Sequence, residues 1–213
     1  MRKVLASLVF MFFACAAAAA PLRIAALGDS LVQGYGLAPD QGLVPQLESW
    51  LRDQGVEVQL INAGVSGDTT AGGAARIDWT LAENPDGLIV LLGGNDLLRG
   101  IDPAETKANL ARILAAAQVK KIDVLLIGVQ ALGNYGPAYK ASFDVLYGEL
   151  AEEYGVMLFD NAFSGIAAKT AGDPIALQKF MQGDGIHPNA EGVTLNVRAL
   201  GPATLDLITQ MQD

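Results

Sequence analysis

The chain has 213 residues, of which 51% are hydrophobic and 17% charged, and its formal net charge is −9. This length gives one domain with a substantial buried core, and the acidic balance excludes electrostatic binding to nucleic acid or to an anionic membrane surface. The chain has one cysteine, Cys15, and one histidine, His187, which excludes a disulfide framework and argues against a zinc site.

The first 19 residues have the pattern of a secretory signal peptide. Arg2 and Lys3 precede an apolar run over residues 4–15, and alanines follow it. The run is shorter than the roughly 20 apolar residues that a membrane-spanning helix needs, which argues against a retained anchor. We therefore expect cleavage after Ala19 and a single mature domain over residues 20–213.

Cleavage would change the composition of the mature chain. It would remove Cys15, leaving no disulfide and no thiol nucleophile, and the loss of Arg2 and Lys3 would change the net charge from −9 to −11. Lipid attachment at Cys15 is the alternative, although residues 12–14 fit a lipoprotein signal poorly. We expect a periplasmic or secreted protein that does not stay inserted in the membrane; the sequence leaves its oligomeric state open.

Strand-like and helix-like hydrophobic patterns alternate along the mature chain. The strand over 88–92 is continuously apolar, as in a sheet covered on both faces, and Asp102 and Pro103 are typical of a helix start. In chain order the predicted elements are a strand over 22–27, a helix over 40–54, a strand over 56–61, a helix over 72–83, a strand over 88–92, a helix over 103–118, a strand over 122–127, a helix over 137–154, a strand over 156–159 and a helix over 189–211.

This alternation predicts an α/β fold, a flavodoxin-like three-layer α/β/α sandwich with a mainly parallel five-stranded sheet. In such sheets the functional loops follow the carboxyl ends of the strands. Three of these loops are small, polar and rich in glycine, and they contain residues 28–30, 62–67 and 93–96. We expect the three loops to lie along one edge of the sheet.

His187 is the single histidine, so a mechanism that needs a histidine base must use it. Asp184 lies three residues upstream, in a loop before the last predicted helix, and this spacing can bring its carboxylate against the imidazole. The carboxylate would then fix the tautomer of the ring and stabilise the imidazolium. The alternative is a surface histidine beside the turn proline Pro188.

Ser30 is the candidate nucleophile, because the mature chain has no cysteine and Ser30 directly follows the first strand. Gly28 permits a sharp turn there. A serine at the start of a helix presents its hydroxyl outward, with its own amide near the positive end of the helix dipole. The alternative is an ordinary N-cap serine.

Acyl transfer generates an oxyanion that needs preorganised donors, and two neighbouring loops can supply them. Gly64 offers a backbone N–H with no side chain to block a substrate, and Asn95 offers a side-chain amide. The alternatives are a plain turn glycine and a helix cap. All of these candidates lie at predicted carboxyl ends of strands in one alternating fold, which favours the catalytic interpretation.

Four blocks of the sequence resemble the SGNH (GDSL) hydrolase family in order and approximate spacing. Segments 62–73, 75–79 and 97–100 are most similar to a branch of periplasmic esterases that includes acyl-CoA thioesterase I, lysophospholipase L1 and bacterial arylesterases. The resemblance spans nearly the whole mature chain. The four blocks are Gly28-Asp-Ser-Leu31, Gly64, Gly93-Gly-Asn-Asp96 and Asp184-Gly-Ile-His187.

The resemblance implies the SGNH hydrolase fold and a serine esterase that needs no cofactor and no metal. It implies that Ser30 is the nucleophile, that Asp184 and His187 complete the triad, and that Ser30, Gly64 and Asn95 form the oxyanion hole. The implied substrates are small-molecule or lipid esters: carboxylic (aryl or acyl) esters, with thioesters, lysophospholipids and acetylated sugars as further options.

Apolar residues in the loops near the predicted site favour an acyl chain over a sugar, with ordinary packing as the alternative. The family branch tends to carry prolines where this chain has Leu132 and Gly133, so the substrate preference stays open. The candidates for substrate contact are Leu97, Leu132, Tyr135 and Ile186, with Leu98 and Ile101 close by.

Two other functions fit the sequence less well than an esterase does. A non-catalytic lipid- or carbohydrate-binding module on the same scaffold would be expected to have lost a triad residue, and none is missing. A nucleotide-binding flavodoxin-like protein is disfavoured, because neither a P-loop nor a Gly-x-Gly-x-x-Gly motif follows the first strand.

Overall fold

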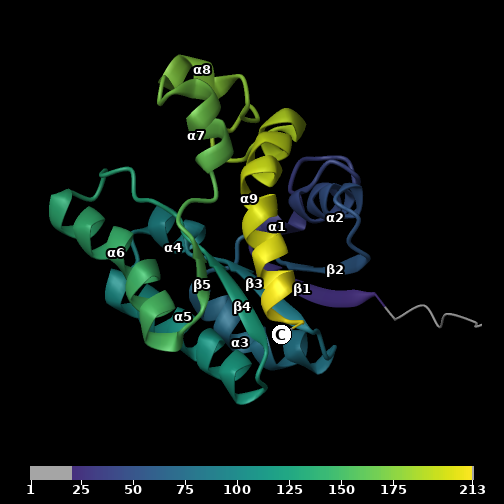
Figure 1. The fold of residues 1–213 in the computed structure, drawn as a ribbon. Coiled ribbons are helices and arrows are strands. Elements are labelled where there is room, and N and C mark those ends of the chain that lie inside the picture. Colours follow the sequence, from purple (N-terminus) through teal and green to yellow (C-terminus); the bar gives the residue numbers. More distant parts are fainter. Residues whose placement is uncertain (1–20, 213) are drawn as a thin grey trace, which may run out of the picture.

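The structure is a computed structural model that describes residues 21–212, so the predicted signal peptide and Cys15 lie outside the described residues. Five strands form one parallel sheet in the order β2-β1-β3-β4-β5 (Figure 1). The predicted α/β fold with a five-stranded parallel sheet is confirmed. The strands are β1 (Leu22–Gly28), β2 (Val58–Gly64), β3 (Gly87–Leu91), β4 (Asp123–Ile127) and β5 (Met157–Phe159).

Helices cover both faces of the sheet, which gives the three layers (Figure 1). One face is covered by α2 (Leu43–Asp53) and α9 (Ala190–Gln210), which pack against each other. The other face is covered by α3 (Thr70–Ala82), α5 (Pro103–Val119) and α6 (Pro137–Tyr154). Over residues 21–212, none of the helices has both the length and the apolar character needed to span a membrane.

Four short helices are missing from the predicted series of elements, since each has only four to seven residues and shows no clear 3.6-residue period. Two of them, α1 (Ser30–Gln33) and α4 (Gly94–Arg99), follow β1 and β3 and carry candidate site residues. The other two, α7 (Ser164–Thr170) and α8 (Pro174–Gln178), pack on each other beside α9, and α8 projects away from the sheet (Figure 1).

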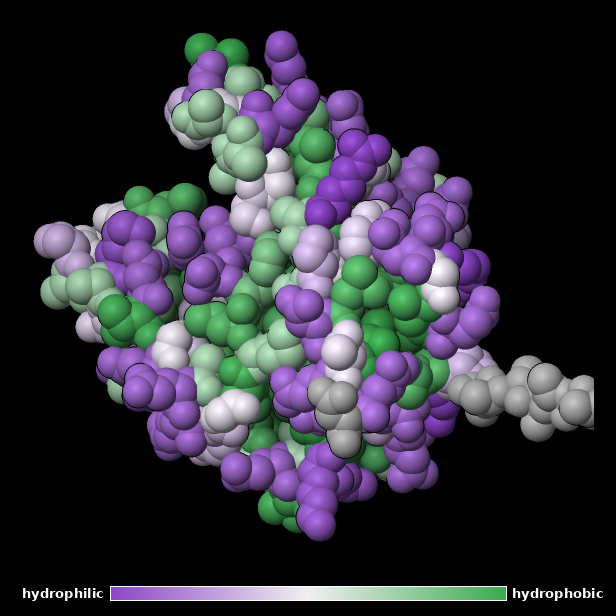
Figure 2. Space-filling view, viewed as in Figure 1, coloured by the Kyte–Doolittle hydropathy of each residue, from purple (hydrophilic) through white to green (hydrophobic). Residues whose placement is uncertain are grey.

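The hydrophobic core lies around the central strands, because helices cover both of their faces. All five residues of β3 are buried, and fully buried side chains from the helices, such as Leu110 and Phe143, pack around the sheet. Full burial of an apolar side chain of this size contributes about 1.5–3 kcal/mol. The edge strand β5 is only half-buried, and Figure 2 shows apolar side chains over it, between α6 and α9.

The second strand lies later in the chain than predicted. The prediction ended it at residue 61, but β2 continues to Gly64, which pairs with Gly28 of β1. Because β2 is an edge strand, this extension needs backbone pairing and no run of apolar side chains. As a result β1 and β2 end level with each other, and the loops that follow them begin side by side.

Gly28 determines how the chain leaves β1. A Cβ at this position would collide with the side chain of Val32 and lie 2.8 Å from the carbonyl oxygen of Leu91. Because glycine has no side chain, α1 can fold back directly after the strand. Ser30, the first residue of α1, is therefore held at the carboxyl edge of the sheet.

Candidate active site

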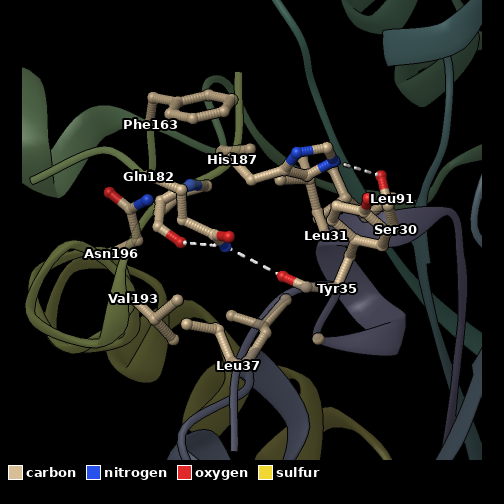
Figure 3. A pocket seen from close by; sticks show the side chains of 14 residues that line it. Ser30, Leu31, Tyr35, Leu37, Leu91, Phe163, Gln182, His187, Val193 and Asn196 are labelled. Carbon is tan, nitrogen blue, oxygen red and sulfur yellow. Dashed lines mark hydrogen bonds between the residues drawn. The ribbon is translucent and has the colours of Figure 1, made fainter. Parts of the chain in front are cut away.

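The hydroxyl of Ser30 lies within hydrogen-bonding distance of the only imidazole. Ser30 Oγ is 2.8 Å from His187 Nε2 (Figure 3), although the two residues are 157 positions apart in the sequence. Ser30 is half-buried and does not cap its helix: the N-cap is Asp29, whose side chain accepts the N–H of Leu31 at 3.0 Å. The N-cap alternative for Ser30 is therefore wrong.

Asp184 holds both the ring and the backbone of His187. Its Oδ2 is 2.6 Å from His187 Nδ1, and its Oδ1 accepts the backbone N–H groups of Ile186 at 2.9 Å and His187 at 3.0 Å. A carboxylate on Nδ1 places the ring proton there, which leaves Nε2 as the acceptor for the Ser30 hydroxyl. These interactions bring together the three residues predicted as a triad.

Hydrogen bonding to the charged form sets the protonation state of Asp184. The backbone N–H of His187, the ring of His187 and the backbone N–H of Ile186 together lower the pKa of Asp184 to about 2. Desolvation acts in the opposite direction and raises the pKa. Because the Asp184 side chain is 35% exposed, desolvation is weaker than the three hydrogen bonds. Asp184 therefore stays ionised beside the imidazole at neutral pH.

Asn95 lies in α4, after β3, and its side chain points toward the β1–α1 turn. Its Nδ2 donates to Asp29 Oδ2 at 3.2 Å, which leaves the second N–H of the amide for another acceptor. Gly93 is the N-cap of α4, so the capping alternative for Asn95 is wrong. Burial raises the pKa of Asp29, and the hydrogen bonds from Leu31 and Asn95 only partly oppose this.

The backbone N–H of Gly64 already donates a hydrogen bond within the protein. It donates to Asn62 Oδ1 at 2.9 Å, and the residue packs so closely on α1 that a Cβ would collide with the backbone of Gln33. This geometry argues against the predicted role of Gly64 as an oxyanion donor. In the same loop Gly67 is exposed, with φ at +84°, and over the described part of the chain its N–H has no hydrogen-bond partner.

Arg76 in α3 ties together the ends of the two strands that lead into the site. Its guanidinium donates to Gly28 O at 2.8 Å, to Ala63 O at 2.7 Å and to Asp68 Oδ2 at 2.7 Å. Asp68 directly follows Gly67, so Arg76 also anchors the loop that carries the free N–H. Arg76 was not among the predicted site residues, because its partners are mostly backbone carbonyls that no side-chain pattern reveals.

The four residues predicted to contact substrate differ in exposure. Leu97 is only 8% exposed and belongs to the main core, so its predicted role in substrate contact is not supported. Leu132 is 89% exposed, and Tyr135 and Ile186 are each 44% exposed. Tyr135 also donates its hydroxyl to Leu98 O at 3.0 Å, which joins the loop that carries Leu132 and Tyr135 to helix α4.

A small cavity lies on the α1 and α9 side of the triad (Figure 3). Its volume is about 30 Å³, enough for a small group but not for a long acyl chain. It is lined mainly by apolar side chains, including Leu31, Leu37, Phe163 and Val193. None of the four predicted substrate-contact residues lines it, so a longer acyl chain would have to lie along the exposed loops instead.

A serine, a histidine and an aspartate joined by hydrogen bonds at the carboxyl edge of a parallel sheet form the arrangement of serine hydrolases. Comparison with known proteins gives the family. Residues 26–195 match the GDSL-like Lipase/Acylhydrolase family, and the chain belongs to it. Over residues 21–212, no group of three or more histidine, cysteine, aspartate or glutamate side chains could hold a metal ion.

The chain is also similar to individual members of this family. It is 40% identical to "Esterase TesA" of Pseudomonas aeruginosa over 80% of this chain and 81% of that protein, and 32% identical to "Arylesterase" of Vibrio mimicus over 88% and 90%. The crystal structure of AlinE4, an SGNH-hydrolase family esterase, superposes with a TM-score of 0.72 at 41% identity, covering 89% of this chain and 98% of AlinE4. These similarities confirm the resemblance to the SGNH (GDSL) family.

We expect Asp184→Asn to lower the free energy of unfolding at neutral pH but to matter less in acid. The folded-state pKa of about 2 lies below the unfolded value of roughly 3.9, so the contribution of the charge is present above about pH 4 and is lost as the pH falls to about 2. Urea unfolding of wild type, Asp184→Asn and the surface control Asp78→Asn between pH 2 and 7 measures it. A difference that grows toward pH 2 would contradict this assignment.

Proposed function

We propose that this protein is a serine esterase that hydrolyses carboxylic esters through an acyl-enzyme. The observation that carries the proposal is the pair of short contacts on one imidazole, 2.8 Å from Nε2 to Ser30 Oγ and 2.6 Å from Nδ1 to Asp184 Oδ2. Relatives named esterase, arylesterase and thioesterase 1/protease 1/lysophospholipase L1 support it.

The reaction proceeds in two transfers. His187 Nε2 takes the proton of Ser30 as Oγ attacks the carbonyl carbon, and Asp184 stabilises the imidazolium. The bond to the leaving alcohol or thiol then breaks, and that group receives the proton from His187. Water repeats the sequence on the acyl-enzyme: it gives a proton to His187, attacks the carbonyl, and the proton returns to Ser30 as the acid leaves.

Three N–H donors stabilise the oxyanion in this proposal. They come from the backbone of Ser30, the backbone of Gly67 and the side chain of Asn95. Gly67 replaces the predicted Gly64, because the N–H of Gly64 is bonded to Asn62, whereas the N–H of Gly67 has no partner among residues 21–212. The signal available in the sequence was that Gly67 lies in the same glycine-rich loop, residues 62–67, as Gly64.

The substrate class is an aryl or acyl ester whose acyl part lies on an apolar rim. Leu132, Tyr135 and Ile186 expose apolar surface on loops of this edge, which supports an acyl chain over a sugar. Thioesters and lysophospholipids share the same acyl chemistry. The predicted signal peptide over residues 1–19 supports export to the periplasm or the medium, where this reaction would take place.

We expect Ser30→Ala to reduce turnover of p-nitrophenyl acetate by about 10⁴-fold or more, because the substitution removes the oxygen that forms the acyl-enzyme. A fluorophosphonate probe should label wild type and the control Ser49→Ala, but not Ser30→Ala. Wild-type turnover in a folded Ser30→Ala protein would remove Ser30 from the mechanism. Stable binding of lipid or sugar by a wild type that the probe never labels would favour the binding module.

We expect Asn95→Ala to lower kcat by about 10²–10³-fold with little change in KM, since an oxyanion donor acts mainly in the transition state. Steady-state kinetics measures this, and thermal unfolding shows whether the variant is folded. If kcat is unchanged in a folded variant, the Asn95 amide serves only its bond to Asp29, and another donor holds the oxyanion.

We expect kcat/KM to rise with acyl length from p-nitrophenyl acetate to octanoate. Full burial of a methylene is worth about 0.8 kcal/mol, roughly fourfold, and a half-exposed rim gives about twofold per methylene. The variant Leu132→Ser should flatten this slope and leave acetate hydrolysis unchanged. A steady decline from acetate upward would instead favour the alternative of a carbohydrate acetylesterase.

A further inference from the structure

The side chain of Gln182 joins the two segments on which the Ser30–His187 contact depends (Figure 3). Its Nε2 donates to Tyr35 O at 2.8 Å and to Pro188 O at 3.0 Å. Tyr35 lies in the loop that directly follows α1, the helix that begins with Ser30, and Pro188 directly follows His187. One amide group thus connects backbone segments that are far apart in the sequence.

The backbone of Gln182 closes the loop that carries the histidine. Its N–H donates to His187 O at 2.7 Å, and its carbonyl oxygen accepts the N–H of Gly185 at 3.0 Å. Met181 and Pro188 form an antiparallel bridge at the base of the same loop. The loop is therefore a closed turn, and the Gln182 side chain is what fastens this turn to the segment after α1.

The Tyr35 segment in turn limits the position of the imidazole. The rings of Tyr35 and His187 lie 4.8 Å apart between centroids, tilted by 41°. The next residue, Gly36, has φ at +73°, and a Cβ there would collide with Oε1 of Gln182. Because Gln182 packs against this segment and Tyr35 packs against His187, a shift of the Gln182 amide would move the surface on which the imidazole rests.

We propose that Gln182 is a positioning residue, which sets the place of the His187 ring relative to Ser30 by bridging Tyr35 O and Pro188 O. The inference rests on the proposed function, because the position of the His187 ring affects the rate only if His187 is the base for Ser30. Gln182 touches no reacting atom. Its loss would leave two backbone carbonyls without their shared donor and free the turn to shift, and a displacement of about 1 Å at a reacting group can cost about 10²-fold in rate.

Gln46 offers a matched control. Its Nε2 also bridges two backbone carbonyls, Gln41 O at 2.7 Å and Ala190 O at 3.2 Å, the second of them 144 residues away. This bridge joins the start of α2 to the start of α9 and does not line the cavity beside the triad. Gln46 therefore resembles Gln182 in donating from one amide to two backbone carbonyls, but it also accepts from Thr194 Oγ1 at 2.6 Å and its amide does not bond to the segment that carries Tyr35.

The kinetic test uses the full chain with Gln182→Met, Gln182→Glu and Gln46→Met. Methionine keeps the length of the side chain but removes the amide donors. Glutamate keeps the shape but places an acceptor oxygen where Nε2 donates to both carbonyls. We expect each Gln182 variant to lower kcat on p-nitrophenyl butyrate by about 10–100-fold with KM changed less than about twofold. Gln46→Met should keep wild-type kcat within about twofold, and thermal unfolding is recorded for all three.

A second measurement does not depend on turnover. Because His187 is the only histidine in the chain, its imidazole signals in ¹H–¹⁵N NMR spectra are unambiguous. We expect these signals to shift or broaden in Gln182→Met and to stay at their wild-type positions in Gln46→Met. A wild type without Ser30-dependent turnover would overturn the proposed function, and the NMR comparison would still decide the role of Gln182.

Three outcomes would overturn the positioning role. The first is wild-type kcat together with wild-type ring signals in a folded Gln182→Met protein. The second is an equal loss of kcat in Gln46→Met, which would assign the effect to general stability. The third is failure of both Gln182 variants to fold, which would make Gln182 a residue of the fold and not of the site.

Discussion

The hydrogen bond between Ser30 and His187 is the constraint on which the rest of the site depends. A general base must lie within about 2.6–3.2 Å of the hydroxyl that it deprotonates, and here the two groups come from opposite ends of the chain. The apolar sheet fixes one side, because Gly28 lets α1 start directly at the end of β1. The other side is a loop with little apolar burial, so polar contacts must fix it. Asp184 holds the ring and the backbone of this loop, and the Gln182 side chain ties the loop to the nucleophile segment.

Two aspartates at this edge show how environment separates chemically identical groups. Asp184 is partly exposed, yet three N–H donors lower its pKa to about 2, so it keeps its charge and can stabilise the imidazolium. Asp29 is 3% exposed, and its pKa is raised because burial penalises its charge. Its oxygens are occupied by the N–H of Leu31 and the amide of Asn95, which suits a group that orients neighbours. Asp184 is therefore the carboxylate whose surroundings favour the ionised form beside His187.

The sequence predicted best the features that side-chain patterns carry. Apolar runs located the central strands. The chain has one histidine and one cysteine, so few residues could serve as a catalytic base or nucleophile. Features that depend on backbone partners were missed. The extension of β2 to Gly64 is backbone pairing with β1, and the choice between Gly64 and Gly67 depends on which N–H is already bonded. Arg76 and Gln182 look like ordinary polar residues in the sequence, because most of their partners are carbonyl oxygens brought close only by the fold.

The fold uses different interactions for stability and for active-site geometry. Removing a buried core side chain such as Phe143 would cost about 3–5 kcal/mol, whereas one hydrogen bond typically contributes about 0.5–1.5 kcal/mol. The loops at the carboxyl edge are held largely by the second kind of interaction, from side chains to backbone carbonyls and N–H groups. We expect the loss of one such bond to leave the sheet and its helices intact, because the buried core does not depend on it. Since the rate is far more sensitive to position than the total stability is to one hydrogen bond, the positioning role proposed for Gln182 would tune catalysis while the core below it stays unchanged.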